Sequence, residues 1–348
     1  MTKNKQITRI ENNVLVNGYP VYQALREIKN IFITQDINFT YASAKEFKTL
    51  QSLNQEWISA NKPCPVRTSI YVCGRDFDFR DPLAGAFAWI FASRFSCKND
   101  GVFIAEPGGG FKDYAGQPCV WFPEMTGKDI LRLLGGRGGF TQAFEPYPIQ
   151  PCAVSVHRSY RLLNNELNII STTHDFQTFA ETVNADGEKT LSEWERAAIK
   201  QITRRLPIVV NVLDDRGSCE ILVHDELLED VTQEKISDPA QIPSKFDHYG
   251  EENPLPDDIE SRTFSLSDDG SIASGTAAHG CHPDIRVADE YTKMFSVVVD
   301  ESYNIHVYDE QHQALASIPY LGGDTYVRYA DAMCGIAAML YPLLRRTR

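Results

Sequence analysis

The most constraining feature of the chain is a short apolar segment that ends on a cysteine and precedes a charged turn and a long apolar run. Ser69 to Val72 are predicted to form a buried strand, because β-branched residues fill a segment bounded by proline and glycine. The strand ends on Cys73. From about Pro82 the run LAGAFAWIFASRF predicts a buried helix with that proline in its first turn. This order is typical of an α/β sheet with its chemistry at the carboxyl ends of strands.

Cys73 has two interpretations. A helix N-terminus favours a thiolate, which makes Cys73 a candidate reactive or metal-binding group, although buried cysteines are also common as small apolar residues. The chain has 348 residues and eight cysteines without regular spacing, and its first residues resemble neither a secretory signal nor a transit peptide. These features favour reduced thiols in a cytoplasmic protein. The apolar run over 326–344 contains Arg328 and Asp331 and is expected to be a core helix, not a membrane span.

The net charge of −13 is concentrated in one segment. Residues 225–269 carry fourteen Asp and Glu against three Lys and Arg, together with four prolines. This composition predicts an exposed, irregular segment, either a plain loop or a lid, a partner-docking surface or a weak cation site. Because no basic stripe occurs, nucleic acid is not an expected partner.

The first third of the chain gives further expectations. A short strand near Val14 should precede a helix over 22–31, and a second helix is expected over 42–60. A strand over 101–105 leads into the glycine run PGGGF, which is either a turn or a loop that binds an anion. A helix over 128–134 should end at the next glycine run.

The middle of the chain reads as a separate α+β module. Its two alternating arms, AVSVH and LNIIS, predict a hairpin, and two helices should follow over 175–183 and 191–204. The linker NADGEKT resembles a calcium loop poorly, because Lys189 stands where that loop needs glycine, and a capping box explains the same residues. A second hairpin, 208–213 with 220–223, closes the module.

The last quarter holds a cluster of possible zinc ligands. In AAHGCHPDIR two imidazoles, His279 and His282, lie near a thiol and a carboxylate, although without a standard ligand spacing. Strands are expected over 295–299, 304–308 and 314–318, and His306 shares one face of the second strand with Tyr308. That face can equally be solvated. A terminal helix carries Cys334.

Several of these motifs, taken in order, resemble the low-CO2-inducible B protein family, which includes theta-class carbonic anhydrases. The matching pieces are FT and AKEF, SIYVCGRD, a helix, GF, AAHGCHPD, a hairpin and CGIAAML, within about 39–118 and 275–340. Three departures stand out. Gly74 is inserted before Arg75 and Asp76, about 150 residues separate the matching halves, and Ser296 stands where the family has a histidine.

The resemblance implies a β-carbonic-anhydrase-like α/β sheet with flanking helices, interrupted by a large α+β insertion. The core domain would comprise 1–144 and 275–348, and the insertion 145–274 with its acidic irregular segment. It implies a Zn²⁺-dependent lyase that interconverts CO2 and bicarbonate, or a non-catalytic relative, and a homodimer. Two thiolates and one imidazole leave a zinc position for water, whose pKa falls towards neutrality. The implied ligands are Cys73, Cys334 and His306, with His282 and His279 as alternatives, and Asp76 with Arg75 would gate the metal or orient the water.

Two alternatives from the residues stay open. The first is a thiol hydrolase with Cys73 or Cys281 as the nucleophile and His306 as the base. The second is a non-enzymatic binding or scaffold protein that uses the acidic middle segment.

Overall fold

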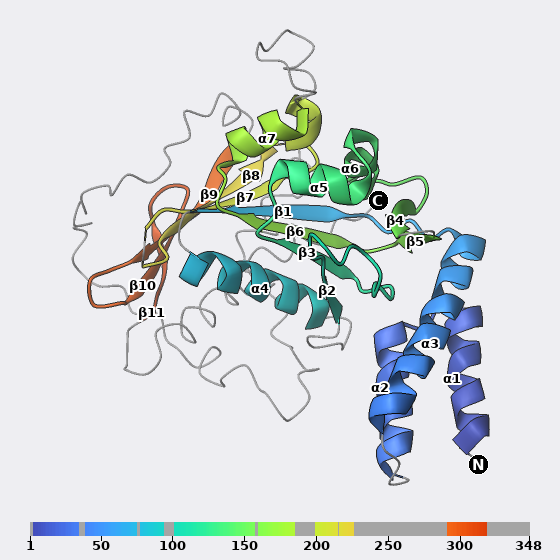
Figure 1. The fold of residues 1–348 in the computed structure, drawn as a ribbon. Helices are drawn as coiled ribbons and strands as arrows, with labels where there is room; N and C mark the ends of the chain where they lie inside the picture. Colours follow the sequence, from blue (N-terminus) through green and yellow to red (C-terminus); the bar gives the residue numbers. More distant parts are fainter. Residues whose placement is uncertain are drawn as a thin grey trace.

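The computed structural model describes residues 3–34, 39–74, 77–93, 101–156, 159–184, 199–214, 216–225 and 291–318. Its centre is a mixed sheet of nine strands (Figure 1). Five strands run parallel: β1 (Thr68–Cys73), β2 (Val102–Ile104), β3 (Cys119–Pro123), β6 (Leu167–Thr172) and β7 (Ile208–Val212). Four continue as an antiparallel meander: β8 (Cys219–His224), β9 (Tyr291–Val299), β10 (Ile305–Asp309) and β11 (Ala314–Ile318). The order is β11-β10-β9-β8-β7-β1-β6-β3-β2.

Helices cover both faces of the parallel part (Figure 1). One face packs against α4 (Phe77–Ser93), and the other carries α5 (Gly127–Leu134), α6 (Arg137–Ala143) and α7 (Phe176–Asn184). A separate hairpin of β4 (Cys152–Val156) and β5 (Ser159–Leu163) also lies on the second side. The fold is therefore mixed α/β, as predicted.

The central strand β1 is buried on both faces, and its apolar residues run from Ile70 to Cys73. Ile70 and Val72 belong to the core on the α4 side, whereas Tyr71 and Cys73 belong to the core under α5 and α7. All six residues of the strand are buried. Central parallel strands have this continuous apolar pattern instead of an alternating one.

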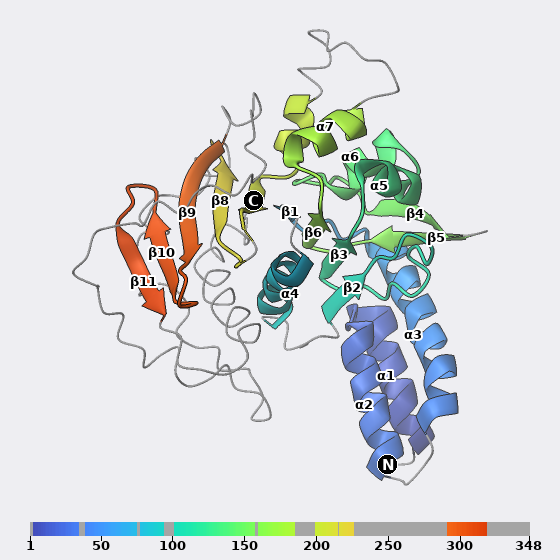
Figure 2. The same ribbon diagram turned by 60° about the vertical axis from the view of Figure 1, so that its left-hand side comes forward.

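Three helices form a bundle beside the sheet: α1 (Lys3–Asn17), α2 (Val21–Thr34) and α3 (Phe39–Asn61) (Figures 1 and 2). The expected helix over 42–60 is confirmed, but the expected strand near Val14 is wrong. Ile10 and Val14 lie one helical turn apart in α1 and are buried in the bundle core. Glutamines tie α3 to the rest of the molecule, since Gln51 donates to the Lys112 and Tyr114 carbonyls over 2.9 and 2.7 Å.

The described residues do not divide into a core domain and an inserted module. Both neighbours of β1, namely β6 and β7, come from the range 145–274, and so does β8. The last quarter does join the sheet of β1 as expected, but through β7 and β8. The boundary prediction failed because a local pattern identifies a strand without identifying the strands beside it.

Two of the predicted hairpins are confirmed and one is wrong. β7 pairs with β8, and β9 pairs with β10. The third strand expected there, β11, pairs with β10. The first arm, as far as Val156, lies in β4 and pairs with β5, whereas LNIIST forms the parallel strand β6 beside β1. All six residues of β6 are buried, which explains this placement at the centre of the sheet.

The start of α4 differs from the sequence-based prediction, whereas the end of α5 agrees with it. Pro82 lies inside α4, five residues after its first described residue, and not in the first turn. The expected end of α5 is confirmed, because Gly135 is its C-cap in the left-handed conformation with φ 79°. Among the described helices, none is long and apolar enough to cross a membrane.

Candidate functional site

The five parallel strands end at one edge of the sheet, and the connections leaving that edge diverge between β1 and β6. The chain leaves β1 into α4 on one face and leaves β6 into α7 on the other. Ligand sites of open α/β sheets occur at such a switch point, outside the carboxyl ends of the strands. This edge is therefore the first place to search for chemistry, and it is named here the carboxyl edge.

Cys73 is the last residue of β1 and lies at the carboxyl edge. It pairs with Thr172 on β6 and with Asn211 on β7. The thiol is buried and donates to the Asn211 side-chain oxygen over 3.7 Å. The N-termini of α4, α5 and α7 lie at the same edge, since each helix follows a parallel strand, and helix dipoles of this orientation favour a thiolate.

The close approach of β7 explains why the residue after Cys73 is a glycine. Gly74 has φ 150°, and a Cβ atom there would lie 2.6 Å from the Val212 Cβ and 2.9 Å from the Val212 carbonyl oxygen. No side chain fits without moving β7. The absence of a side chain at Gly74 therefore lets β7 pass close to the end of β1.

Arg80 holds the main chain at Gly74, directly after Cys73. Its side chain is fully buried, and Nη1 donates to the Gly74 carbonyl over 2.9 Å. The guanidinium also forms ion pairs with Asp81, over 3.5 Å, and with Glu124 at the end of β3. Glu124 has a left-handed backbone with φ 53°, which is costly for a residue with a side chain and occurs most often at functional sites.

A hydrogen-bonded chain continues from Asp81 across the strand ends. Ser171 on β6 donates to Asp81 over 3.0 Å and accepts a hydrogen bond from the Trp121 indole over 3.0 Å. The side chains of Asp81 and Glu124 are 33% and 40% exposed, so solvent reaches the two carboxylates although it does not reach Arg80.

His174 also lies at the carboxyl edge. It follows the end of β6 by two residues, and its carbonyl accepts a hydrogen bond from the Tyr71 hydroxyl over 2.9 Å. Its Nδ1 atom is buried and has no hydrogen-bond partner in the described part of the chain. Thr172, two residues before His174, is the residue that pairs with Cys73.

His174 also faces the N-terminus of α5. There the pKa of Asp129 lies below its ordinary value, chiefly because Thr126 donates a hydrogen bond to it, with smaller contributions from Arg132 and His174. Thr126 and Asp129 form a reciprocal capping box at this end of the helix.

The structure does not bring His306 to Cys73. β7, β8 and β9 lie between β1 and β10 in the sheet, and four interstrand steps amount to about 19 Å. Two ligands of one tetrahedral zinc lie only about 4 Å apart, and both side chains are too short to close the difference. His306 is therefore neither the zinc partner of Cys73 nor its catalytic base.

The other predicted site residues lie outside the described residues. These are Arg75, Asp76, His279, Cys281, His282 and Cys334, together with the acidic segment over 226–269. Within the described ranges, no three His, Cys, Asp or Glu side chains lie together in a way that could hold a metal ion.

The glycine run after β2 is a turn. The Gly109 and Gly110 amides both donate to the Glu106 carbonyl, over 3.2 and 3.1 Å. An anion would have to displace these bonds, so the interpretation as an anion-binding loop is disfavoured relative to the plain turn.

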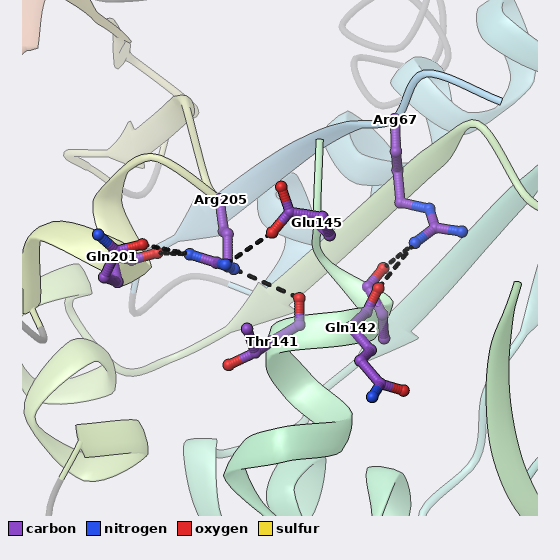
Figure 3. Close-up of polar contacts among 7 residues, drawn as sticks. Arg67, Thr141, Gln142, Glu145, Gln201 and Arg205 are labelled. Atoms are coloured by element: carbon purple, nitrogen blue, oxygen red, sulfur yellow. Dashed lines mark hydrogen bonds and ion pairs between the residues drawn. The ribbon is translucent and has the colours of Figure 1, made fainter. Parts of the chain in front are cut away.

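A second polar cluster lies at the opposite, amino edge of the parallel strands (Figure 3). Arg67, directly before β1, is buried and donates to the carbonyls of Asn165, Gln142 and Ala143 over 3.0, 3.1 and 2.7 Å. Burial lowers the pKa of this guanidinium. The last two carbonyls end α6, so Arg67 acts as a C-terminal cap of that helix.

Arg205 extends this cluster. It donates to the Glu145 carboxylate over 2.6 Å, to the Gln201 carbonyl over 2.7 Å and to the Thr141 carbonyl over 3.3 Å (Figure 3). Most of the acceptors of both arginines are main-chain carbonyls.

No protein-family model matches the chain, and no curated protein matches it either.

Sequence reasoning missed Arg80 and His174. Arg80 stands in FDFRDP, where a charged residue before a helix reads as a solvated turn. His174 follows a segment that was assigned to a hairpin, so its position at the end of a parallel strand went unrecognised. The segment LNIIST has three apolar residues, Leu167, Ile169 and Ile170, among polar ones, so no continuous apolar run pointed to a central parallel strand.

Proposed function

We propose that the carboxyl edge holds a zinc ion and that the protein is a zinc-dependent lyase interconverting CO2 and bicarbonate. The proposed ligands are the thiolates of Cys73 and Cys334 and the imidazole of His174. The observation that carries the proposal is the position of Cys73, a buried thiol at the end of the central strand. Two residues beyond the end of the neighbouring strand β6, the Nδ1 atom of His174 has no hydrogen-bond partner among the described residues.

The described donors fit part of such a site. A thiol and an imidazole are the ligand types that zinc prefers, and the buried Nδ1 of His174 suits a ligating nitrogen. The third donor must come from the end of the chain. Cys334 follows Ile318 by sixteen residues, which span up to about 50 Å when extended, whereas β11 lies about 24 Å from β1.

The chain offers two further histidines. His282 and His279 precede Tyr291, the first residue of β9, by nine and twelve residues, which span about 30 and 40 Å when extended. Both can reach the carboxyl edge by length. They are the alternative ligands if His174 has another role.

When bound, the zinc ion would lower the pKa of a water molecule and so allow water to add to CO2 at neutral pH. The residues around it would have separate tasks. Asn211 holds the Cys73 side chain in position, and Arg80 fixes the Gly74 carbonyl and with it the turn that leads to Arg75 and Asp76. These last two would gate access to the site. Reduced thiols are required, which suits a cytoplasmic location.

Metal analysis of the purified full-length protein, combined with a CO2 hydration assay, tests the proposal. We expect about one zinc per chain, lost in Cys73→Ala, Cys334→Ala and His174→Ala and retained in Cys219→Ala, whose thiol lies in the core on the α4 side. Retention of zinc in Cys73→Ala contradicts the site. If His282→Ala or His279→Ala loses zinc while His174→Ala retains it, the histidine ligand is reassigned and the rest of the site is unaffected.

The two measurements also separate the enzyme from a relative without activity. Zinc with CO2 hydration supports the lyase. Zinc without hydration identifies a non-catalytic relative, and a protein without zinc contradicts both. The homodimer implied by the resemblance is part of the same proposal, and the mass of the zinc-loaded protein in solution tests it.

A further inference from the structure

A second group of reactive side chains lies on the β9–β11 meander, far from Cys73. His306 on β10 contacts the Ser317 hydroxyl on β11 through Nδ1, over 3.1 Å. Its Nε2 contacts the Asp300 carboxylate over 3.3 Å. Asp300 stands in the turn between β9 and β10, so this turn, β10 and β11 each contribute one side chain.

Asp300 is held rigidly by the turn. One carboxylate oxygen accepts from the amides of Ser302 and Asn304, over 2.8 and 2.9 Å, and the other accepts from the Asn304 side chain over 2.8 Å. Partial burial would raise the pKa of Asp300, but the hydrogen bonds from Asn304, His306 and Ser302 outweigh it and hold the pKa below its ordinary value. The carboxylate is therefore ionised at neutral pH and accepts hydrogen bonds only.

The ionised carboxylate sets the tautomer of the neutral imidazole. Because Asp300 cannot donate, the proton of His306 lies on Nε2, and Nδ1 is left as an acceptor. The Ser317 hydroxyl then donates to Nδ1. A hydroxyl that donates to an imidazole, which itself donates to a fixed carboxylate, is the arrangement that activates a serine nucleophile.

We propose that Ser317, His306 and Asp300 form a second active site that hydrolyses small carboxylic esters, independent of the proposed zinc site. Ser317 Oγ bonds to the ester carbonyl carbon while its proton moves to His306 Nδ1. The bond to the alcohol then breaks, and the alcohol leaves with that proton. A water molecule, losing a proton to His306, next attacks the acyl group, and the acid leaves as Ser317 recovers its proton. Asp300 is a positioning residue.

The surroundings favour a small substrate. The side chains of His306 and Asp300 are 21% and 37% exposed, and Ser317 is partly exposed, so the site opens directly to solvent. The Tyr308 ring lies on the same face, 6.5 Å from the imidazole between centroids, and offers an apolar surface for a short acyl group. The β10–β11 register shifts between Val307 and Tyr308, an irregularity of the kind that occurs beside active sites.

A fluorophosphonate probe on the full-length protein tests the proposal, with peptide mass spectrometry to locate the adduct and p-nitrophenyl acetate to measure turnover. We expect one adduct, on Ser317, and none in Ser317→Ala. His306→Gln and Asp300→Asn should slow labelling and turnover by a factor of about 10² or more. Ser296→Ala, on the same face of β9, is the matched control and should label at the wild-type rate.

Three outcomes would overturn the proposal: no adduct, an adduct on another residue, or an unchanged labelling rate in His306→Gln. If Ser317→Ala failed to fold, it would lose labelling for that reason alone, so Ser317→Cys provides a second test. The thiol of Ser317→Cys should react with iodoacetamide faster when His306 is present than in the double variant that also carries His306→Gln. Equal rates for the two also reject the proposal. Since Ser317→Ala leaves all proposed zinc ligands in place, its zinc content separates failure here from failure of the lyase proposal.

Discussion

The two edges of the parallel sheet each bury an arginine, but they use it differently. At the amino edge Arg67 donates to three main-chain carbonyls. At the carboxyl edge Arg80 donates to one carbonyl and forms ion pairs with Asp81 and Glu124, whose carboxylates reach solvent. An arginine that hydrogen-bonds only to main-chain carbonyls stabilises the fold. An arginine that pairs with solvent-accessible carboxylates also positions groups that a ligand can contact. Burial alone therefore does not identify a functional arginine.

Replacing the amino-edge arginine should cause the largest loss of stability. In Arg67→Leu the Asn165 carbonyl loses its donor, whereas the Gln142 and Ala143 carbonyls each lose one hydrogen bond and keep another, from the Glu145 amide and the Asn168 side chain. An unsatisfied buried group costs about 1–3 kcal/mol and a lost hydrogen bond about 1 kcal/mol, so we expect a total of about 3–5 kcal/mol. Urea unfolding measures this. Arg132→Leu, at an exposed side chain paired with Asp129, should change stability by less than about 0.5 kcal/mol.

The same variant separates structure from function. If the amino edge only stabilises the fold, folded Arg67→Leu should bind as much zinc per chain as the wild type. A stability loss below about 1 kcal/mol, or a selective loss of zinc, would mean that the two edges do not differ as inferred.

The sequence predicted individual helices and strands better than it predicted which strands lie side by side in the sheet. β1, the hairpin of β7 and β8, the meander of β9 to β11 and the end of α5 all follow from local patterns of apolar, turn and capping residues. Strand order does not, because β1 pairs with segments about 100 and 140 residues away along the chain. For the same reason the sequence could not show that a central part of the sheet comes from the supposed insertion.

The candidate sites show the same limit. Cys73 was predicted from its own neighbourhood, as a thiol between a strand and a helix. His174 and Arg80 become candidates only when β6 is known to lie beside β1 and β3 beside β6. The partners of His306 were equally hidden, since Ser317 faces it only through the register of β10 and β11.

A substitution at Gly74 should affect both stability and the carboxyl edge. In Gly74→Ala the new Cβ would overlap Val212, which forces β7 or the turn to move, and we expect a loss of about 2–3 kcal/mol together with reduced zinc. Urea unfolding and metal analysis of one preparation measure the two effects.

The matched control is a glycine in α6. A Cβ on Gly138 would meet nothing within 4 Å, so Gly138→Ala should leave stability unchanged or raise it by up to about 1 kcal/mol. If Gly74→Ala proves as mild as Gly138→Ala, β7 does not approach the end of β1 as closely as the structure gives it.

The smallest expected effect concerns the capping box of α5, at the carboxyl edge. Thr126→Ala removes the cap and should cost about 1 kcal/mol at neutral pH. Part of this cost depends on pH. The folded pKa of Asp129 lies below its ordinary value of 3.8, chiefly through the Thr126 hydrogen bond, so its stabilising contribution is present above that value and is lost as the pH falls through the folded pKa.

The difference in stability between wild type and Thr126→Ala should therefore be smaller at pH 3 than at pH 7, without vanishing, because the Thr126 hydroxyl still accepts from the Asp129 amide. Urea midpoints at the two pH values measure it. Glu145→Gln gives the comparison at the amino edge, where the partly exposed pair with Arg205 should be worth about 0.5–1 kcal/mol. A Thr126→Ala effect that grows towards pH 3 would contradict the role of Asp129, because a carboxylate stabilised by its cap can only lose that stabilisation as it gains a proton.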